Sequence, residues 1–170
     1  MTPVVLVGLM GSGKSTVDAL VAEATGRTFV DVDVAIRERT GKTVRRLWEE
    51  GGEAAYRRLE SDAVLQTLRR DDVVLAAPGG VVLDPVVRAA LRNAFVVWLR
   101  TEPATLAQRV NDDDHRPLLG EHPLEVLTKM ADERAGLYEQ VADLVIDIDH
   151  SDAATVAGLV VHEFRERGLG

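Results

Sequence analysis

The stretch GLMGSGKST, residues 8–16, follows directly on the apolar run VVLV at residues 4–7. It contains the pattern GxxxxGK[ST], in which glycines let consecutive backbone N–H groups turn toward one anion. The β-branched run predicts a strand, and residues 15–25 have the pattern of a helix. A strand, a glycine loop and a helix in this order predict a binding site for the phosphates of a nucleotide, to which the helix start adds its positive dipole end.

The residues of this loop have distinct expected roles. Lys14 is placed to reach the β- and γ-phosphates of a nucleoside triphosphate, and the Ser15 hydroxyl is placed to bind Mg²⁺. The residues expected to contact the nucleotide here are Gly11, Ser12, Gly13, Lys14, Ser15 and Thr16. The alternative interpretation is an ordinary glycine-rich helix start with an exposed lysine.

Short β-branched runs alternate with longer helical patterns along the rest of the chain. Strands are expected at residues 4–7, 29–32, 73–76, 95–99 and 144–148, and helices at residues 15–25, 53–70, 85–91, 103–110, 123–138 and 153–167. This alternation predicts an α/β fold of βαβ units around a mainly parallel sheet. Because the strand runs are almost wholly apolar, both faces of the sheet should be covered.

Composition limits the kind of protein that this sequence encodes. Its 170 residues, 46% of them hydrophobic, suffice for one domain with a substantial core. The formal net charge of −8 argues against general binding to nucleic acid or to an anionic membrane, and no apolar run has the length of a membrane helix. Because there is no cysteine, disulfides and thiolate metal sites are excluded, and a cytoplasmic location is expected.

Two carboxylates follow the second predicted strand. Asp31 and Asp33 are two residues apart, so in an extended chain both side chains point to the same side. Ligands of open α/β sheets sit beyond the carboxyl ends of the strands, where one carboxylate could order Mg²⁺ through water and another could accept a proton from an attacking hydroxyl. The alternative is that either Asp caps the helix that follows.

Further segments extend the pattern beyond the phosphate loop. In chain order they are DVD at 31–33, GEAAYRRLE at 52–60, PGGVVLDP at 78–85, RPLL at 116–119 and RAGLY at 134–138. Together with the loop they resemble the shikimate kinases over nearly the whole chain. The resemblance implies a single domain, residues 1–170, with the fold of nucleoside-monophosphate kinases: a five-stranded parallel sheet flanked by helices, with a mobile lid at about residues 111–123.

The same resemblance implies an activity. It predicts a cytoplasmic monomer that uses ATP and Mg²⁺ to phosphorylate the 3-hydroxyl of shikimate. Asp33 matches the carboxylate that binds this hydroxyl and serves as the base. The positions matched to substrate binding are Asp33, Arg57, Gly79, Gly80 and Arg134. Paired arginines suit a small hydroxy acid, because a planar guanidinium donates two hydrogen bonds to a carboxylate and a lysine does not.

The resemblance also assigns the nucleotide side. Lys14 and the lid arginine, Arg116, match catalytic groups that contact the phosphates, and Arg109 matches an arginine that lies against the adenine. Asp31 matches a carboxylate that reaches Mg²⁺ through water, beside Ser15.

Several alternatives stay open. Arg57 could pair with Glu53 or Glu60 on the surface of its helix, and Trp48 and Tyr56 suit ordinary packing positions. For the whole chain, the alternatives are another small-molecule kinase with a phosphate loop, such as a gluconate kinase, and a non-catalytic nucleotide-binding regulator.

Two positions depart from the family pattern. Pro78, which has no N–H and a fixed φ, stands where the family has the first of three glycines. Asp18 stands where glycine is usual in the helix after the phosphate loop. Asp18 brings a negative charge within a turn of Lys14, or favours the helix start through the dipole.

Overall fold

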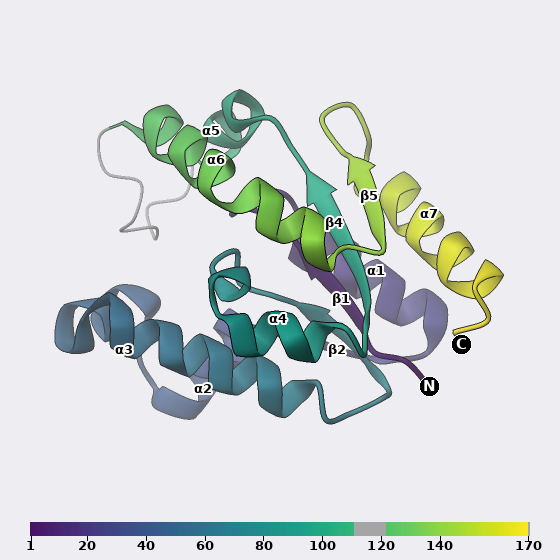
Figure 1. The fold of residues 1–170 in the computed structure, drawn as a ribbon, viewed down its shortest axis with the longest axis horizontal. Coiled ribbons are helices and arrows are strands. Elements are labelled where there is room, and N and C mark those ends of the chain that lie inside the picture. The colour runs from purple at the N-terminus through teal and green to yellow at the C-terminus, as the bar shows by residue number, and fades with distance from the viewer. Residues whose placement is uncertain (111–121, 170) are drawn as a thin grey trace.

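The structure is a computed structural model and describes residues 1–110 and 122–169. Within these residues, five strands form one parallel sheet in the order β2-β3-β1-β4-β5 (Figure 1). The strands are β1 (Val4–Val7), β2 (Thr28–Asp31), β3 (Val73–Ala76), β4 (Phe95–Arg100) and β5 (Leu144–Asp147). The expected α/β fold with a five-stranded parallel sheet is therefore confirmed.

Helices connect the strands, as a parallel sheet requires. They are α1 (Lys14–Thr25), α2 (Val32–Thr40), α3 (Val44–Thr67), α4 (Pro85–Leu91), α5 (Pro103–Val110), α6 (Pro123–Val141) and α7 (Ala153–Glu166), with a 3₁₀ turn, η1 (Val81–Leu83), before α4. The side chains of Thr43, Asp84 and Asp152 accept backbone N–H groups at the starts of α3, α4 and α7. These caps fix where the helices begin.

Two apolar cores, one on each face of the sheet, hold the helices in place. In β1, Val4 and Leu6 belong to the core formed with α1 and α7, whereas Val5 and Val7 belong to the core formed with α2 to α6. Figure 1 shows α1 and α7 close together. Because successive side chains of a strand point to opposite faces, a wholly apolar strand serves both cores.

The prediction that Asp31 and Asp33 share an extended chain is wrong. β2 ends at Asp31 and α2 begins at Val32, so Asp33 lies in the first turn of a helix. Oδ1 of Asp31 accepts the backbone N–H groups of Asp33 and Val34, at 3.0 and 3.3 Å. The capping alternative therefore holds for Asp31, because these two bonds satisfy donors that the helix start leaves without partners.

The third helix also differs from its prediction. α3 begins at Val44 and not near residue 53, and its backbone leaves helical geometry at Gly52, where φ is 73°. The break redirects the chain, and the part of α3 after it carries Tyr56, Arg57 and Glu60 into the pocket described below.

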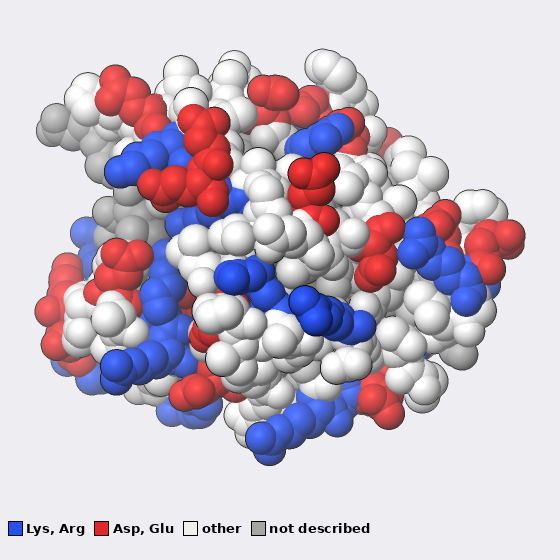
Figure 2. Space-filling model, in the orientation of Figure 1, with Lys and Arg blue, Asp and Glu red and all other residues white. Residues whose placement is uncertain are grey.

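The surface carries both signs of charge. Acidic and basic side chains are interspersed on the face in Figure 2, although the formal net charge of the whole chain is −8. Among the residues described, no helix combines the length and the apolar character needed to cross a membrane.

Candidate active site

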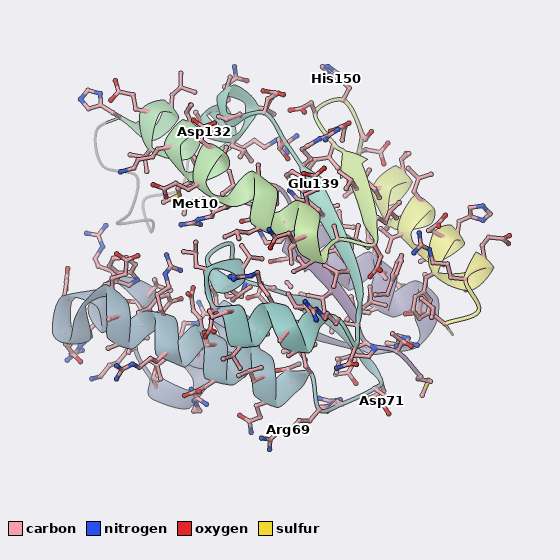
Figure 3. All side chains as sticks on the ribbon, in the orientation of Figure 1. Met10, Arg69, Asp71, Asp132, Glu139 and His150 are labelled. Atoms are coloured by element: carbon pink, nitrogen blue, oxygen red, sulfur yellow. The ribbon has the colours of Figure 1, made fainter. Side chains whose placement is uncertain are left out.

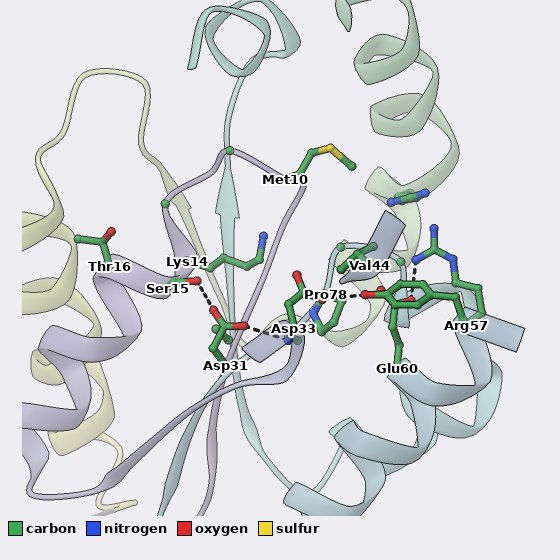
Figure 4. Close-up of a pocket in the computed structure, with 18 of the residues that line it drawn as sticks. Met10, Lys14, Ser15, Thr16, Asp31, Asp33, Val44, Arg57, Glu60 and Pro78 are labelled. Carbon is green, nitrogen blue, oxygen red and sulfur yellow. Dashed lines mark hydrogen bonds and ion pairs between the residues drawn. The ribbon is translucent and has the colours of Figure 1, made fainter. Parts of the chain in front are cut away.

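A pocket of about 480 Å³ opens where the parallel strands β1, β2 and β3 end (Figure 4). This volume is typical of sites for small ligands. The pocket brings together most of the predicted site residues: Gly11, Gly13, Lys14, Ser15, Thr16, Asp31, Asp33, Arg57, Gly79, Gly80, Arg109 and Arg134. They come from six different parts of the chain, and the carboxyl ends of the strands place them at one edge of the sheet.

The loop after β1 has the backbone that phosphate binding needs. Gly11 and Gly13 have φ values of 81° and 77°, in the left-handed region that glycine adopts without strain. Ser12 between them is buried, and its Oγ accepts a hydrogen bond of 3.3 Å from Nζ of Lys14. Nζ also donates to the carbonyl oxygen of Gly8 at 2.8 Å. The lysine charge therefore lies against the loop, beside the N-terminus of α1, in the arrangement that suits an anion.

Ser15 and Asp31 form an oxygen-rich corner beside the loop. Oγ of Ser15 donates a hydrogen bond of 2.5 Å to Oδ2 of Asp31, whose other oxygen caps α2. Mg²⁺ in nucleotide sites takes one or two protein oxygens, several waters and the phosphates of the substrate. This corner fits such a partly hydrated ion. A site made only of protein ligands does not fit, since the described residues contain no group of three acidic or histidine side chains able to hold a metal.

Buried charges occupy the side of the pocket away from Lys14 (Figure 4). Nη1 of Arg57 donates a hydrogen bond of 2.6 Å to Oε2 of Glu60, and Glu60 and Arg134 are 3% and 5% exposed. Burial raises the pKa of Glu60 to about 7, although the Arg57 guanidinium opposes the rise. Nε of Arg134 is buried with no hydrogen-bond partner among the described residues. Arg57 also pairs with the exposed carboxylate of Glu53, at 3.5 Å from Nε to Oε1, whereas Arg134 forms no ion pair with another described residue. An anionic ligand would therefore stabilise the buried guanidinium of Arg134.

The turn after β3 brings backbone close to these charges. The Tyr138 hydroxyl donates a hydrogen bond of 2.6 Å to the carbonyl oxygen of Gly79. A Cβ on Gly80 would collide with Nη1 of Arg57, so any larger residue at this position would displace the Arg57 guanidinium. Pro78 also lines the pocket, and its carbonyl accepts a backbone hydrogen bond of 3.1 Å from the first residue of η1. The turn is thus hydrogen-bonded through the proline carbonyl, which the missing N–H does not affect.

The two remaining predicted arginines have different outcomes. Arg109, near the end of α5, lines the pocket beside the phosphate loop, with Nη1 3.5 Å from the carbonyl oxygen of Gly11. Arg116 and residues 111–121 of the predicted lid lie outside the described residues.

Sequence reasoning missed two features of this pocket. Glu60 is buried and lines the pocket, although its charge suggested a surface partner for Arg57. Tyr56 is more than a packing residue, because its hydroxyl donates a hydrogen bond of 3.0 Å to Oδ1 of Asp33. The spacing offered one signal: Tyr56 and Glu60 are four residues apart and so share a helix face, with Arg57 beside them.

The fold and the pocket define the class of protein: an α/β phosphotransferase with a phosphate loop after the central strand of its sheet. A family model described as shikimate kinase matches residues 10–165. Since this match spans most of the chain, the chain belongs to the shikimate kinase family.

Individual relatives agree with this membership. A shikimate kinase of Symbiobacterium thermophilum is 40% identical over 169 residues, which cover 97% of each chain. The solved structure of a shikimate kinase from Acinetobacter baumannii in complex with shikimate superposes with a TM-score of 0.95 at 32% identity, covering 100% of this chain and 96% of that chain. A gluconokinase from Sinorhizobium meliloti, at 18% identity and a TM-score of 0.55 over 98% of this chain and 97% of that chain, shares the fold alone.

Proposed function

We propose that this chain transfers the γ-phosphoryl group of ATP to the 3-hydroxyl of shikimate, which gives shikimate 3-phosphate and ADP. One observation carries the proposal: a phosphate loop and two arginines, the half-buried Arg57 and the buried Arg134, line the same pocket. Asp33 lies between Lys14 and Arg57 in Figure 4. A triphosphate cradle, a carboxylate clamp and an acceptor for a hydroxyl proton are the parts that a kinase acting on a hydroxy acid needs.

Each group has a task in this reaction. Arg57 and Arg134 bind the carboxylate of shikimate and so fix which hydroxyl faces the nucleotide. Asp33 accepts a hydrogen bond from that hydroxyl, orients it and takes its proton as the new P–O bond forms. Lys14 holds the phosphates and offsets the negative charge that spreads over the equatorial oxygens in the transition state. Because that transition state is loose, positioning and charge stabilisation contribute more than the basicity of Asp33.

The proposal includes a metal ion. Ser15 and, through water, Asp31 would hold Mg²⁺, which supplies positive charge to the phosphate oxygens when it is bound. The contact between the Ser15 hydroxyl and the Asp31 carboxylate supports this assignment.

The outer parts of the proposed site follow from the family. Arg109 is assigned to the adenine and Arg116 to the phosphates, with residues 111–123 closing as a lid that excludes water. We further propose that residues 1–170 work as one kinase domain, as a cytoplasmic monomer that binds neither nucleic acid nor membrane.

A coupled assay of ADP release tests the proposed function. Purified protein would receive ATP and Mg²⁺ with shikimate, quinate, gluconate or no acceptor, and a parallel series would contain EDTA. The expected result is fast release with shikimate alone, which EDTA abolishes. Preferential turnover of gluconate would favour the gluconate kinase alternative. Release that no acceptor stimulates would favour the nucleotide-binding regulator, and either outcome would refute the proposal.

A further inference from the structure

The hydroxyl of Tyr56 makes a direct contact with the proposed base. It donates a hydrogen bond of 3.0 Å to Oδ1 of Asp33, and the two residues come from different helices, α3 and α2. Tyr56 is 3% exposed and lines the pocket beside Asp33. The hydroxyl therefore lies where a change in its position would move the carboxylate that the substrate meets.

The ring that carries this hydroxyl is held firmly. Tyr56 packs against Trp48 with ring centroids 6.0 Å apart, across the break in α3 at Gly52. The contact joins the two parts of α3, and the buried ring has little room to change its rotamer. A donor on a fixed ring sets the orientation of the group that accepts from it.

The hydroxyl stays a donor at every working pH. Burial and the nearby carboxylates of Asp33 and Glu60 raise the pKa of the Tyr56 phenol far above its ordinary value. Because the phenol keeps its proton, it remains the donor in the Tyr56–Asp33 hydrogen bond.

We propose that Tyr56 is a positioning residue for phosphoryl transfer, which turns the Asp33 carboxylate so that it meets the hydroxyl of the bound substrate in line with the γ-phosphate. The inference rests on the proposed function and adds a residue to it. A hydrogen bond to one carboxylate oxygen restricts rotation of the carboxylate and so places the other oxygen. Because the transition state is loose, the position of the substrate hydroxyl matters more than the basicity of the group that accepts its proton.

Tyr56→Phe removes the hydroxyl and keeps the ring that packs on Trp48. We expect kcat with shikimate to fall about 10-fold, while the KM values for ATP and shikimate stay within about twofold of wild type, because the ligand-binding groups are retained. A hydroxyl that merely joined α2 to α3 would change thermal unfolding and leave kcat unaltered.

A double-mutant cycle shows whether the effect passes through Asp33. Asp33→Ala removes the acceptor, so adding Tyr56→Phe to that variant should cause no further loss of kcat, measured at high enzyme concentration after subtracting turnover without acceptor. Tyr138→Phe is the matched control, since it deletes another buried tyrosine hydroxyl, one that donates to the carbonyl oxygen of the pocket residue Gly79. Its effect should be the same fold-change with and without Asp33.

The outcomes separate this proposal from the function on which it rests. Wild-type protein without shikimate-dependent ADP release would refute the proposed function itself. If the wild type is active, a wild-type kcat in Tyr56→Phe would overturn the positioning role alone. The positioning role would also be overturned if Tyr56→Phe lowered kcat by the same factor in the wild-type and Asp33→Ala backgrounds.

Discussion

Nη1 of Arg57 and Oε2 of Glu60 lie 2.6 Å apart in a largely buried ion pair on one turn of α3, whereas Arg134 across the pocket forms no ion pair among the described residues. The two arginines are therefore not equivalent. Arg57 is already held by Glu60 and Glu53, whereas the buried Arg134 forms no ion pair with another described residue and so is the guanidinium better placed to bind an anionic ligand. Loss of Arg134 should accordingly affect the binding of an acid more directly.

Arg134→Lys should raise the KM for shikimate about 10-fold or more and leave the KM for ATP nearly unchanged. A point charge replaces a planar fork, so the second hydrogen bond to the carboxylate is lost. Steady-state kinetics with each substrate varied in turn give both constants. Arg58→Lys, on the exposed side of α3, is the control and should alter neither KM. A parallel rise of both constants in Arg134→Lys would mean that this arginine does not bind the acid.

Gly80→Ala should damage shikimate binding through Arg57. The added Cβ would occupy the place of the Arg57 guanidinium, which must shift away from Glu60. We expect the KM for shikimate to rise about 10-fold with little change in ATP affinity. Gly136→Ala is the matched control, because an added Cβ there meets no atom within 4 Å. If Gly80→Ala binds shikimate as the wild type does, the backbone of this turn does not shape the acid site.

Asp33→Asn should lower kcat about 100-fold or more, because the amide accepts no proton from the substrate hydroxyl. ATP binding should persist, since the phosphate loop and Lys14 are unchanged, and calorimetric titration with ATP measures it independently of turnover. A variant that turns over at a near-normal rate would remove Asp33 from the mechanism.

The sequence predicted the elements whose limits are set by local chemistry. β1 and β3 are buried apolar runs with polar or glycine-rich ends, and their bounds agree with the prediction. α4 and α5 likewise agree, because each begins at a proline, the residue best suited to a first helical position. Most predicted site residues line one pocket for a related reason: loops that follow parallel strands must meet at one edge of the sheet.

The parts that the sequence did not predict depend on competition between two local conformations or on tertiary packing. The alternating Asp and Val residues at 31–34 favour an extended chain. Asp31 caps α2, however, and the chain is helical from Val32 onward. For Glu60, helical periodicity gives the face that it shares with Tyr56. That periodicity does not indicate that this face packs into the pocket, where Glu60 is buried and pairs with Arg57. A charge on a helix is assigned to solvent until the packing around it is known.

Asp18 is the clearest case of an unexpected burial. It is 0% exposed in α1, and neither carboxyl oxygen has a hydrogen-bond partner among the described residues. Asp18 lies beyond the first turn of α1, which contains no acidic residue, so the interpretation of a favourable helix-start charge is wrong. Burial raises its pKa well above the ordinary range, while Lys14 opposes the rise and Asp31 adds to it.

The raised pKa of Asp18 makes a prediction about stability and pH. The folded state holds the Asp18 proton more tightly than the unfolded state does. The stability that this proton adds to the folded state is therefore fully present below the unfolded pKa of about 3.9, and it is lost as pH rises toward the folded pKa. Asp18→Asn keeps the shape and removes the titration. The free energy of unfolding of Asp18→Asn minus that of wild type should therefore be larger at pH 8 than at pH 5, by about 1 kcal/mol or more.

Urea unfolding of both proteins at the two pH values measures this difference. Asp132→Asn serves as the control, because Asp132 is an exposed carboxylate on α6 (Figure 3) and its replacement should shift stability equally at both pH values. Comparing each variant with wild type at the same pH cancels the titrations that the proteins share, which leaves the Asp18 proton as the source of any change. An equal effect of Asp18→Asn at pH 5 and pH 8 would mean that this carboxyl has the same charge in the folded and unfolded states, and that its burial is relieved by solvent or by a shift of Lys14.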